Sequence, residues 1–132
     1  MTKEELKQYQ ALKLEKQQLE ELLEEIEAAK TSPKSPKIDG APRGGSRHSG
    51  LEDIVAKYEK TEALYKAKVK EIDEKLLAIE TAIDSLSPTE RRMMRYRYIH
   101  GLKWEEVCVA MPYSWNQAHL IHRAILAKLR DK

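Results

Sequence analysis

The chain has 132 residues, of which 41% are apolar and 35% charged, and it contains no phenylalanine. This composition is typical of long, solvated helices rather than of a thick globular core. The single cysteine, Cys108, cannot form an internal disulfide, which favours a reducing compartment. The chain starts with charged residues and has no apolar run near the ~20 residues of a membrane span. We therefore expect no signal peptide, no membrane association and a cytoplasmic location.

The net charge of +2 conceals an uneven distribution along the chain. Residues 1–30 and residues 51–87 each carry −3, residues 31–50 carry +3, and residues 88–132 carry +5. A basic C-terminal segment joined to acidic helical segments predicts that the C-terminal segment binds a polyanion.

Residues 1–30 predict an N-terminal helix that begins near residue 3. Leucine, glutamate, lysine and glutamine dominate, and glycine and proline are absent. The apolar residues form one stripe at helical spacing, interrupted between Lys13 and Gln18. They are Leu6, Tyr9, Leu12, Leu19, Leu22, Leu23 and Ile26.

Residues 31–50 interrupt the helical pattern with three prolines and four glycines. Proline removes a backbone donor, and glycine loses the most conformational entropy on ordering. We therefore expect a flexible, basic linker. The alternative is a basic arm that itself contacts the polyanion.

Residues 51–86 carry two series of residues at seven-residue spacing. The first series is Leu51, Tyr58, Tyr65, Ile72, Ile79 and Leu86, and the second is Val55, Glu62, Val69, Leu76 and Ile83. Taken as the d and a positions of a heptad, ten of these eleven are apolar, which predicts a coiled-coil seam on one long helix. The seam can pack on the N-terminal helix as an antiparallel hairpin, or on the same helix of a second subunit, and both can coexist in a bundle. We expect a homodimer through this helix.

A new helix is predicted to begin directly after Leu86. Ser87 suits the N-cap, Pro88 the first helical position, and Glu90 completes a capping box. The helix should run from Glu90 to about Tyr98, and Gly101 suits the left-handed position that ends it.

Two further helices are predicted in the last 30 residues. The first covers residues 104–111, and Pro112 cannot continue it comfortably. Ser114 then caps a longer helix that reaches about Arg130, with Gln117 placed for a second capping box. Two helices of unequal length joined by a short turn form the helix-turn-helix pattern, so residues 87–132 predict a helix-turn-helix DNA-binding domain.

The second of these helices would enter the major groove of double-stranded DNA with its N-terminal end. Asparagine and glutamine suit bidentate contacts to adenine. The base-reading candidates are Ser114, Trp115, Asn116, Gln117, His119 and Leu120. The phosphate-contact candidates are Arg91, Arg92, Arg95, Arg123 and Lys128. Trp115 has a second interpretation, as a residue that packs on a protein partner.

Other side chains of this region have structural interpretations. We expect Trp104 and Val107 to be core residues and Cys108 to be a buried structural thiol near the helix crossing. His119 and His122 have a spacing that a metal site can use, but no cysteine or carboxylate completes a set, so we predict no metal site. No catalytic constellation or phosphate-binding glycine loop is present, so we expect neither enzyme activity nor a cofactor.

The C-terminal third resembles region four of bacterial sigma factors. Leu86–Tyr98 resembles its opening, Gly101–Cys108 its first motif helix, Tyr113–His122 its turn and recognition helix, and Ala127–Arg130 its closing stretch. The whole layout is similar to small phage-encoded regulators of the RinA and ArpU late-operon activator kind. The resemblance implies a phage or prophage transcription factor in the cytoplasm of a bacterial host, acting as an activator.

The resemblance has departures. Pro112 stands where sigma factors usually have glycine, Trp115 and Gln117 replace basic residues, and His122 stands where glutamate is usual. These differences predict a target other than the promoter element that sigma factors read.

The sequence thus predicts an all-α chain, with a long helical hairpin or coiled-coil stalk followed by a three-helix, sigma region-four-like helix-turn-helix domain. We expect a sequence-specific, double-stranded DNA-binding transcriptional regulator. One alternative is a small-terminase-like subunit that recognises DNA for packaging, which a ring of about eight or more subunits would favour over a dimer. The other is an adaptor that binds RNA polymerase through its sigma-like surface.

Overall fold

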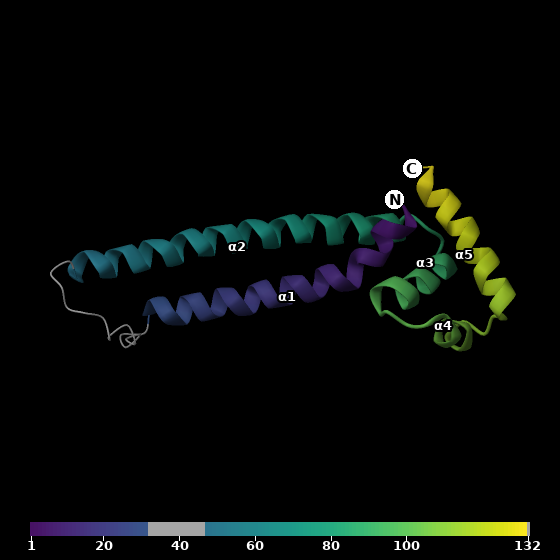
Figure 1. Ribbon diagram of the computed structural model, residues 1–132. Coiled ribbons are helices and arrows are strands. Elements are labelled where there is room, and N and C mark those ends of the chain that lie inside the picture. The colour runs from purple at the N-terminus through teal and green to yellow at the C-terminus, as the bar shows by residue number, and fades with distance from the viewer. Residues whose placement is uncertain (32–46, 132) are drawn as a thin grey trace. The chain divides into compact units, whose positions relative to one another are not determined.

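The computed structural model describes residues 1–31 and 47–131, without the side chains of residues 47–51 (Figure 1). These residues are all-helical and contain no strand, which confirms the predicted all-α class. In chain order the elements are α1 (Lys3–Thr31), α2 (Arg47–Asp84), α3 (Pro88–Met94), the π-helix η2 (Arg95–Ile99), α4 (Trp104–Ala110) and α5 (Trp115–Arg130). Among the described residues, no helix is both long and apolar enough to cross a membrane.

The two long helices follow the predicted boundaries closely at three of their four ends. The exception is the start of α2, which lies at Arg47 rather than at residue 51. Gly50 is therefore inside the helix, where glycine costs about 1 kcal/mol relative to alanine but, unlike proline, removes no backbone bond. The rest of the predicted linker, residues 32–46, lies outside the described residues.

The chain forms two compact units that cut across the four predicted segments. Unit 1 comprises Met1–Leu14 and Ile72–Lys132, and unit 2 comprises Glu15–Glu71. The start of α1 and the end of α2 therefore belong to the same unit as α3, α4 and α5.

Unit 1 is built on one continuous hydrophobic core. Leu6, Ile83, Met93, Met94, Val107, Ile125 and Leu129 are its largest fully buried side chains. Tyr9 also lies in this core, and its hydroxyl donates to Glu80 of α2 at 2.8 Å. Burial, together with that carboxylate, raises the pKa of Tyr9 to about 12. The N-terminal turns of α1 thus pack in the same core as α3, α4 and α5.

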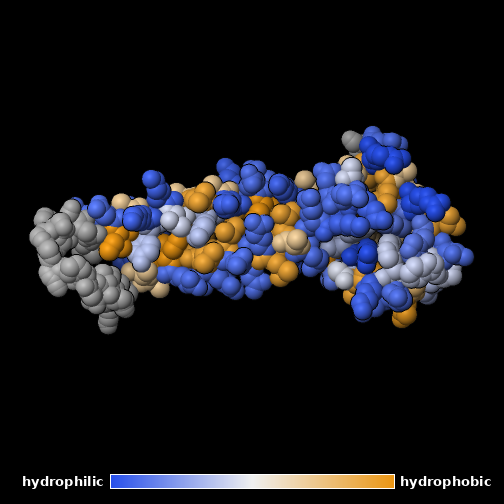
Figure 2. Space-filling view, viewed as in Figure 1, coloured by the Kyte–Doolittle hydropathy of each residue, from blue (hydrophilic) through white to orange (hydrophobic). Residues whose placement is uncertain are grey.

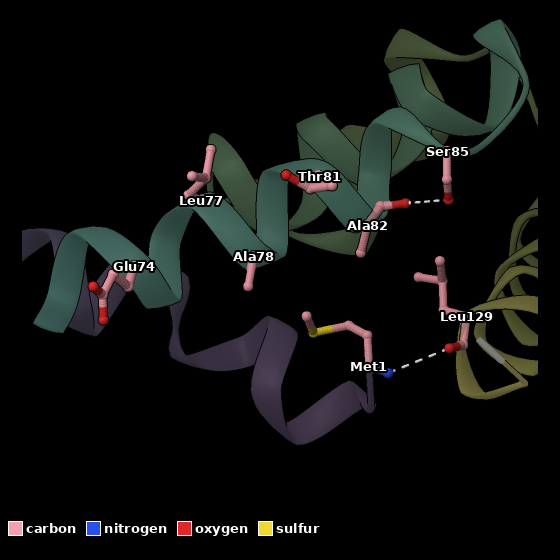
Figure 3. Close-up of a pocket in the computed structure, with 8 residues that line it drawn as sticks. All are labelled: Met1, Glu74, Leu77, Ala78, Thr81, Ala82, Ser85 and Leu129. Carbon is pink, nitrogen blue, oxygen red and sulfur yellow. Dashed lines mark hydrogen bonds between the residues drawn. The ribbon is translucent and has the colours of Figure 1, made fainter.

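A groove of about 570 Å³ lies on the surface of unit 1 (Figure 3). At its edge the amino group of Met1 donates to the carbonyl of Leu129 at 3.3 Å. Its lining residues are Met1, Glu74, Leu77, Ala78, Thr81, Ala82, Ser85 and Leu129. Leu77, which lies off the heptad seam, is 67% exposed there.

Unit 2 pairs the remainder of α1 with the first part of α2. Leu19 and Ile26 are buried, and Tyr58 and Tyr65 line a groove together with Ile26. Glu62, the polar a-position residue, accepts a hydrogen bond from Lys30 at 3.0 Å. This bond is the main cause that lowers the pKa of Glu62.

The heptad seam of α2 is therefore used within the chain in both units. In unit 1 its residues Ile72, Ile79, Ile83 and Leu86 are buried, and in unit 2 Tyr58, Tyr65 and Val69 are half-buried. The seam residues of unit 1 from Ile79 onward share one core with Leu6 and Tyr9 of α1 and with buried residues of α3, α4 and α5. Figure 2 shows hydrophobic side chains at the surface of the long helices, mixed with hydrophilic ones.

Candidate nucleic-acid interface

The entry into the C-terminal helices follows the predicted capping chemistry. Ser87 accepts a hydrogen bond from the backbone of Glu90 at 3.4 Å, and Glu90 accepts one from the backbone of Ser87 at 3.1 Å. This capping box and the proline at the first helical position are confirmed. Gly101 ends the segment with φ 72°, the left-handed conformation that glycine adopts without steric cost.

One local feature of this segment was not predicted. The helix expected from Glu90 to Tyr98 starts at Pro88, and from Arg95 to Ile99 it becomes a π-helix. The backbone N–H of His100 donates to the carbonyl of Arg95, five residues back, at 2.8 Å. The wider turn brings Tyr98 into the core and leaves Tyr96 and Ile99 half-buried.

Helices α4 and α5 are separated by four residues. Val107 of α4 and Ala118 and Ile125 of α5 are fully buried, so the two helices share one apolar contact. At the start of α5, Ser114 accepts a hydrogen bond from the backbone of Gln117 at 3.1 Å, as expected of an N-cap. The predicted core positions of Trp104 and Val107 are confirmed, Trp104 being half-buried. Cys108, expected to be buried, is half-buried against the same core.

Pro112 adopts an unusual backbone conformation between α4 and α5. Its φ is 35°, whereas the pyrrolidine ring favours a φ near −65°. The turn therefore requires the left-handed geometry for which glycine is the usual residue.

The base-reading candidates fall into three groups. Asn116, Gln117 and Leu120 are exposed, and together with the equally exposed Arg123 and Ala124 they form what we call the outer face of α5. Ser114 is exposed but its hydroxyl oxygen is engaged in capping. Trp115 is exposed and His119 half-buried, and their rings stack on each other with a centroid distance of 4.4 Å.

This stack extends from the surface into the interior through Trp104. The ring of His119 lies 4.7 Å from Trp104, which in turn lies 4.6 Å from His122. His119 also donates from Nδ1 to the carbonyl of Trp115 at 3.0 Å, because a carbonyl can only accept. The stacking on His119 thus holds the indole ring of Trp115 against the side of α5. Sequence reasoning assigned Trp104 to the core but had no signal for this link to the surface.

His122 is a buried residue of the core rather than a surface residue. Its side chain is 6% exposed, and its Nε2 lies 2.6 Å from the hydroxyl of Tyr98. Burial is the main cause that lowers the pKa of His122 to about 4, so the ring is neutral at pH 7. In the described part of the chain, no three histidine, cysteine or carboxylate side chains are grouped as a metal would need.

Three of the five phosphate-contact candidates have partners within unit 1. Arg91 donates to the carbonyl of Leu86 at 2.8 Å, and Arg95 pairs with Asp84 at 2.6 Å. Lys128 pairs with Glu90 at 2.5 Å, which is the main cause that lowers the pKa of Glu90. These contacts join α3 and η2 to the end of α2 and the residues just after it, and α3 to the end of α5.

The other two candidates, Arg92 and Arg123, are exposed. The guanidinium of Arg92 lies 5.9 Å from the ring centroid of Tyr96, and Arg123 lies on the outer face of α5. Between Trp115 and Arg130 the sequence contains no acidic residue. The outer face of α5 therefore combines amide, apolar and cationic groups, with no carboxylate from its own helix.

Comparisons with family models, curated proteins and solved structures gave no match to this chain.

Proposed function

We propose that the chain is a sequence-specific, double-stranded DNA-binding transcriptional regulator, with α5 as its recognition helix and with α4 and α5 as a helix-turn-helix. The observation that carries the proposal is the outer face of α5. Its first two turns present Asn116 and Gln117 to solvent on a helix without acidic residues.

The shape and packing of α5 suit the major groove. A helix of 16 residues is about 24 Å long, and the major groove of B-form DNA is wide enough to admit an α-helix. Ala118, Ile125 and Leu129 bury the opposite side of α5 in the core, which fixes the rotation of the helix about its axis. Asn116 and Gln117 then lie at the N-terminal end, where the helix dipole and free backbone N–H groups favour the approach of phosphates.

In this proposal some of the basic side chains bind DNA and the others stabilise the fold. Arg92 and Arg123 supply the sequence-independent attraction to phosphates. Arg91, Arg95 and Lys128 act mainly through their contacts with Leu86, Asp84 and Glu90, which hold α3 against the ends of α2 and α5.

The biological setting rests on the resemblance stated above. The likeness to sigma region four and to phage late-operon activators supports a phage or prophage activator in the bacterial cytoplasm. We propose that it acts as a homodimer whose two recognition helices meet two half-sites. Because Ile72, Ile79 and Ile83 of the α2 seam are buried within the chain, such a dimer would use the exposed side of α2, where Leu77 borders the groove of Figure 3.

A second candidate function is an adaptor for RNA polymerase. The observation that favours it is Val109 of α4, which is 82% exposed and offers an apolar contact that DNA reading does not require. The two functions differ in their DNA preference, because an adaptor that touches DNA weakly selects no defined motif.

The proposal is tested by sequencing the duplexes that the full chain selects from a random library. We expect the wild type to recover a defined motif, whose half-site spacing reports the dimer geometry. Asn116→Ala combined with Gln117→Ala should lose the motif and retain salt-dependent, non-specific binding. The matched control is Gln17→Ala with Gln18→Ala, two neighbouring exposed amides on α1 in unit 2. Recovery of the same motif at the same strength by the Asn116 and Gln117 double variant would contradict the assignment of the reading face.

A further inference from the structure

Leu120 is an exposed leucine at the centre of the outer face of α5. Its side chain is 60% exposed on the outer face of α5. Its neighbours one helical turn away are Asn116 and Gln117 before it and Arg123 and Ala124 after it, all exposed. The core of unit 1 is filled by other side chains of α5, so Leu120 contributes no packing that would explain its apolar character.

The groups around Leu120 indicate what covers it. A protein partner would be matched by a large continuous apolar patch, whereas here the neighbours of Leu120 are two amides, one guanidinium and the small side chain of Ala124. Those polar groups are the ones that bond base edges and phosphates. Among the base edges in the major groove, only thymine presents an apolar group, its 5-methyl.

We infer that Leu120 contacts the 5-methyl group of a thymine and so makes the protein prefer thymine at one position of its site, an inference that rests on the proposed function. Ala118 and Ile125 are fully buried and fix the rotation of α5 about its axis. When the helix enters the major groove of DNA, Leu120 therefore faces the bases together with Asn116 and Gln117. Either of these amides can then read an adenine at the same base pair or at the next one.

The inference is tested on the selected duplex by replacing each thymine in turn with deoxyuridine, which lacks only the methyl group. We expect one replacement to weaken equilibrium binding of the wild-type chain about fourfold, the effect of ~0.8 kcal/mol for one buried methyl. Leu120→Ala should bind the thymine and uracil duplexes with equal affinity. Leu14→Ala, which removes a leucine of similar exposure from α1, should keep the fourfold difference.

Two results would overturn the inference and leave DNA reading by α5 intact. One is a wild-type chain that selects a defined motif but binds every uracil duplex as tightly as the thymine duplex. The other is a Leu120→Ala variant that retains the full thymine preference. A wild-type chain that selects no motif at all would instead overturn the proposed function, and this inference with it.

Discussion

The side chains of α5 divide between the core and the exposed outer face, and His122 belongs to the core. It lies four residues after Ala118 and three before Ile125, on the core side of α5, where it is buried and paired with Tyr98. Ala118, Ile125 and Leu129 recur at helical spacing on one side of α5, and the structure buries all three. The helical spacing with Ala118 and Ile125 could have indicated the burial of His122, but its pairing with Tyr98 of the π-helix has no recognisable sequence signal.

The buried His122 should make stability depend on pH. Its pKa is about 4 in the folded chain against 6.5 when unfolded, so the unfolded chain binds more protons between these values. The free energy of unfolding should be fully retained above pH 6.5 and fall by about 3 kcal/mol as the pH drops from 6.5 to 4. Urea denaturation at a series of pH values measures this slope.

The matched variants for this test are His122→Gln and His119→Gln. In His122→Gln the free energy of unfolding should depend less on pH between pH 4 and 6.5, whatever the stability of this variant at pH 7. The second, a histidine replaced on the same helix, should leave most of the slope in place, because burial remains the main cause of the lowered pKa of His122. An unchanged slope in His122→Gln would show that other groups cause the pH dependence.

At the scale of elements, local signals predicted how the helices start and stop. Ser87, Ser114 and Gly101 perform the roles that their residue types indicate, because capping depends only on neighbouring residues. The contacts that link elements could not be predicted in this way. The pairs Arg95–Asp84 and Lys128–Glu90 join residues that are 11 and 38 positions apart, and they changed the role expected of two phosphate candidates.

In the turn between α4 and α5, Pro112 adopts a positive φ that proline disfavours. Pro112→Gly should raise the free energy of unfolding by about 1 kcal/mol, since relief of a strained φ outweighs the added freedom of the unfolded chain. Thermal or urea unfolding measures the difference.

The control for this substitution is Pro88→Gly. Pro88 stands at the first position of α3, where the ring preorganises the helix, so the same exchange should lower stability. If Pro112→Gly destabilises the chain as much as Pro88→Gly, the turn is not strained in the way proposed.

At the scale of the molecule, the heptad pattern predicted a buried seam but not which residues would share its core. Leu6 and Tyr9 lie in one core with Met93, Val107 and Ile125, so the predicted C-terminal domain is completed by the first turns of the chain. Such long-range packing depends on shape and cannot be inferred from periodicity. Which candidate DNA-contact residues are exposed, and which bond to other residues of the chain, could likewise be seen only in the structure.

The central claim is that α5 reads DNA with its outer face. The most direct measurement is a two-dimensional ¹H–¹⁵N NMR titration of the full chain with the duplex it selects. Backbone and side-chain amide signals of residues 115–124, including the side chains of Asn116 and Gln117, should shift most. Signals from residues 15–31 and 52–71 of unit 2 should shift least. The largest shifts falling in unit 2, with residues 115–124 unchanged, would contradict the account.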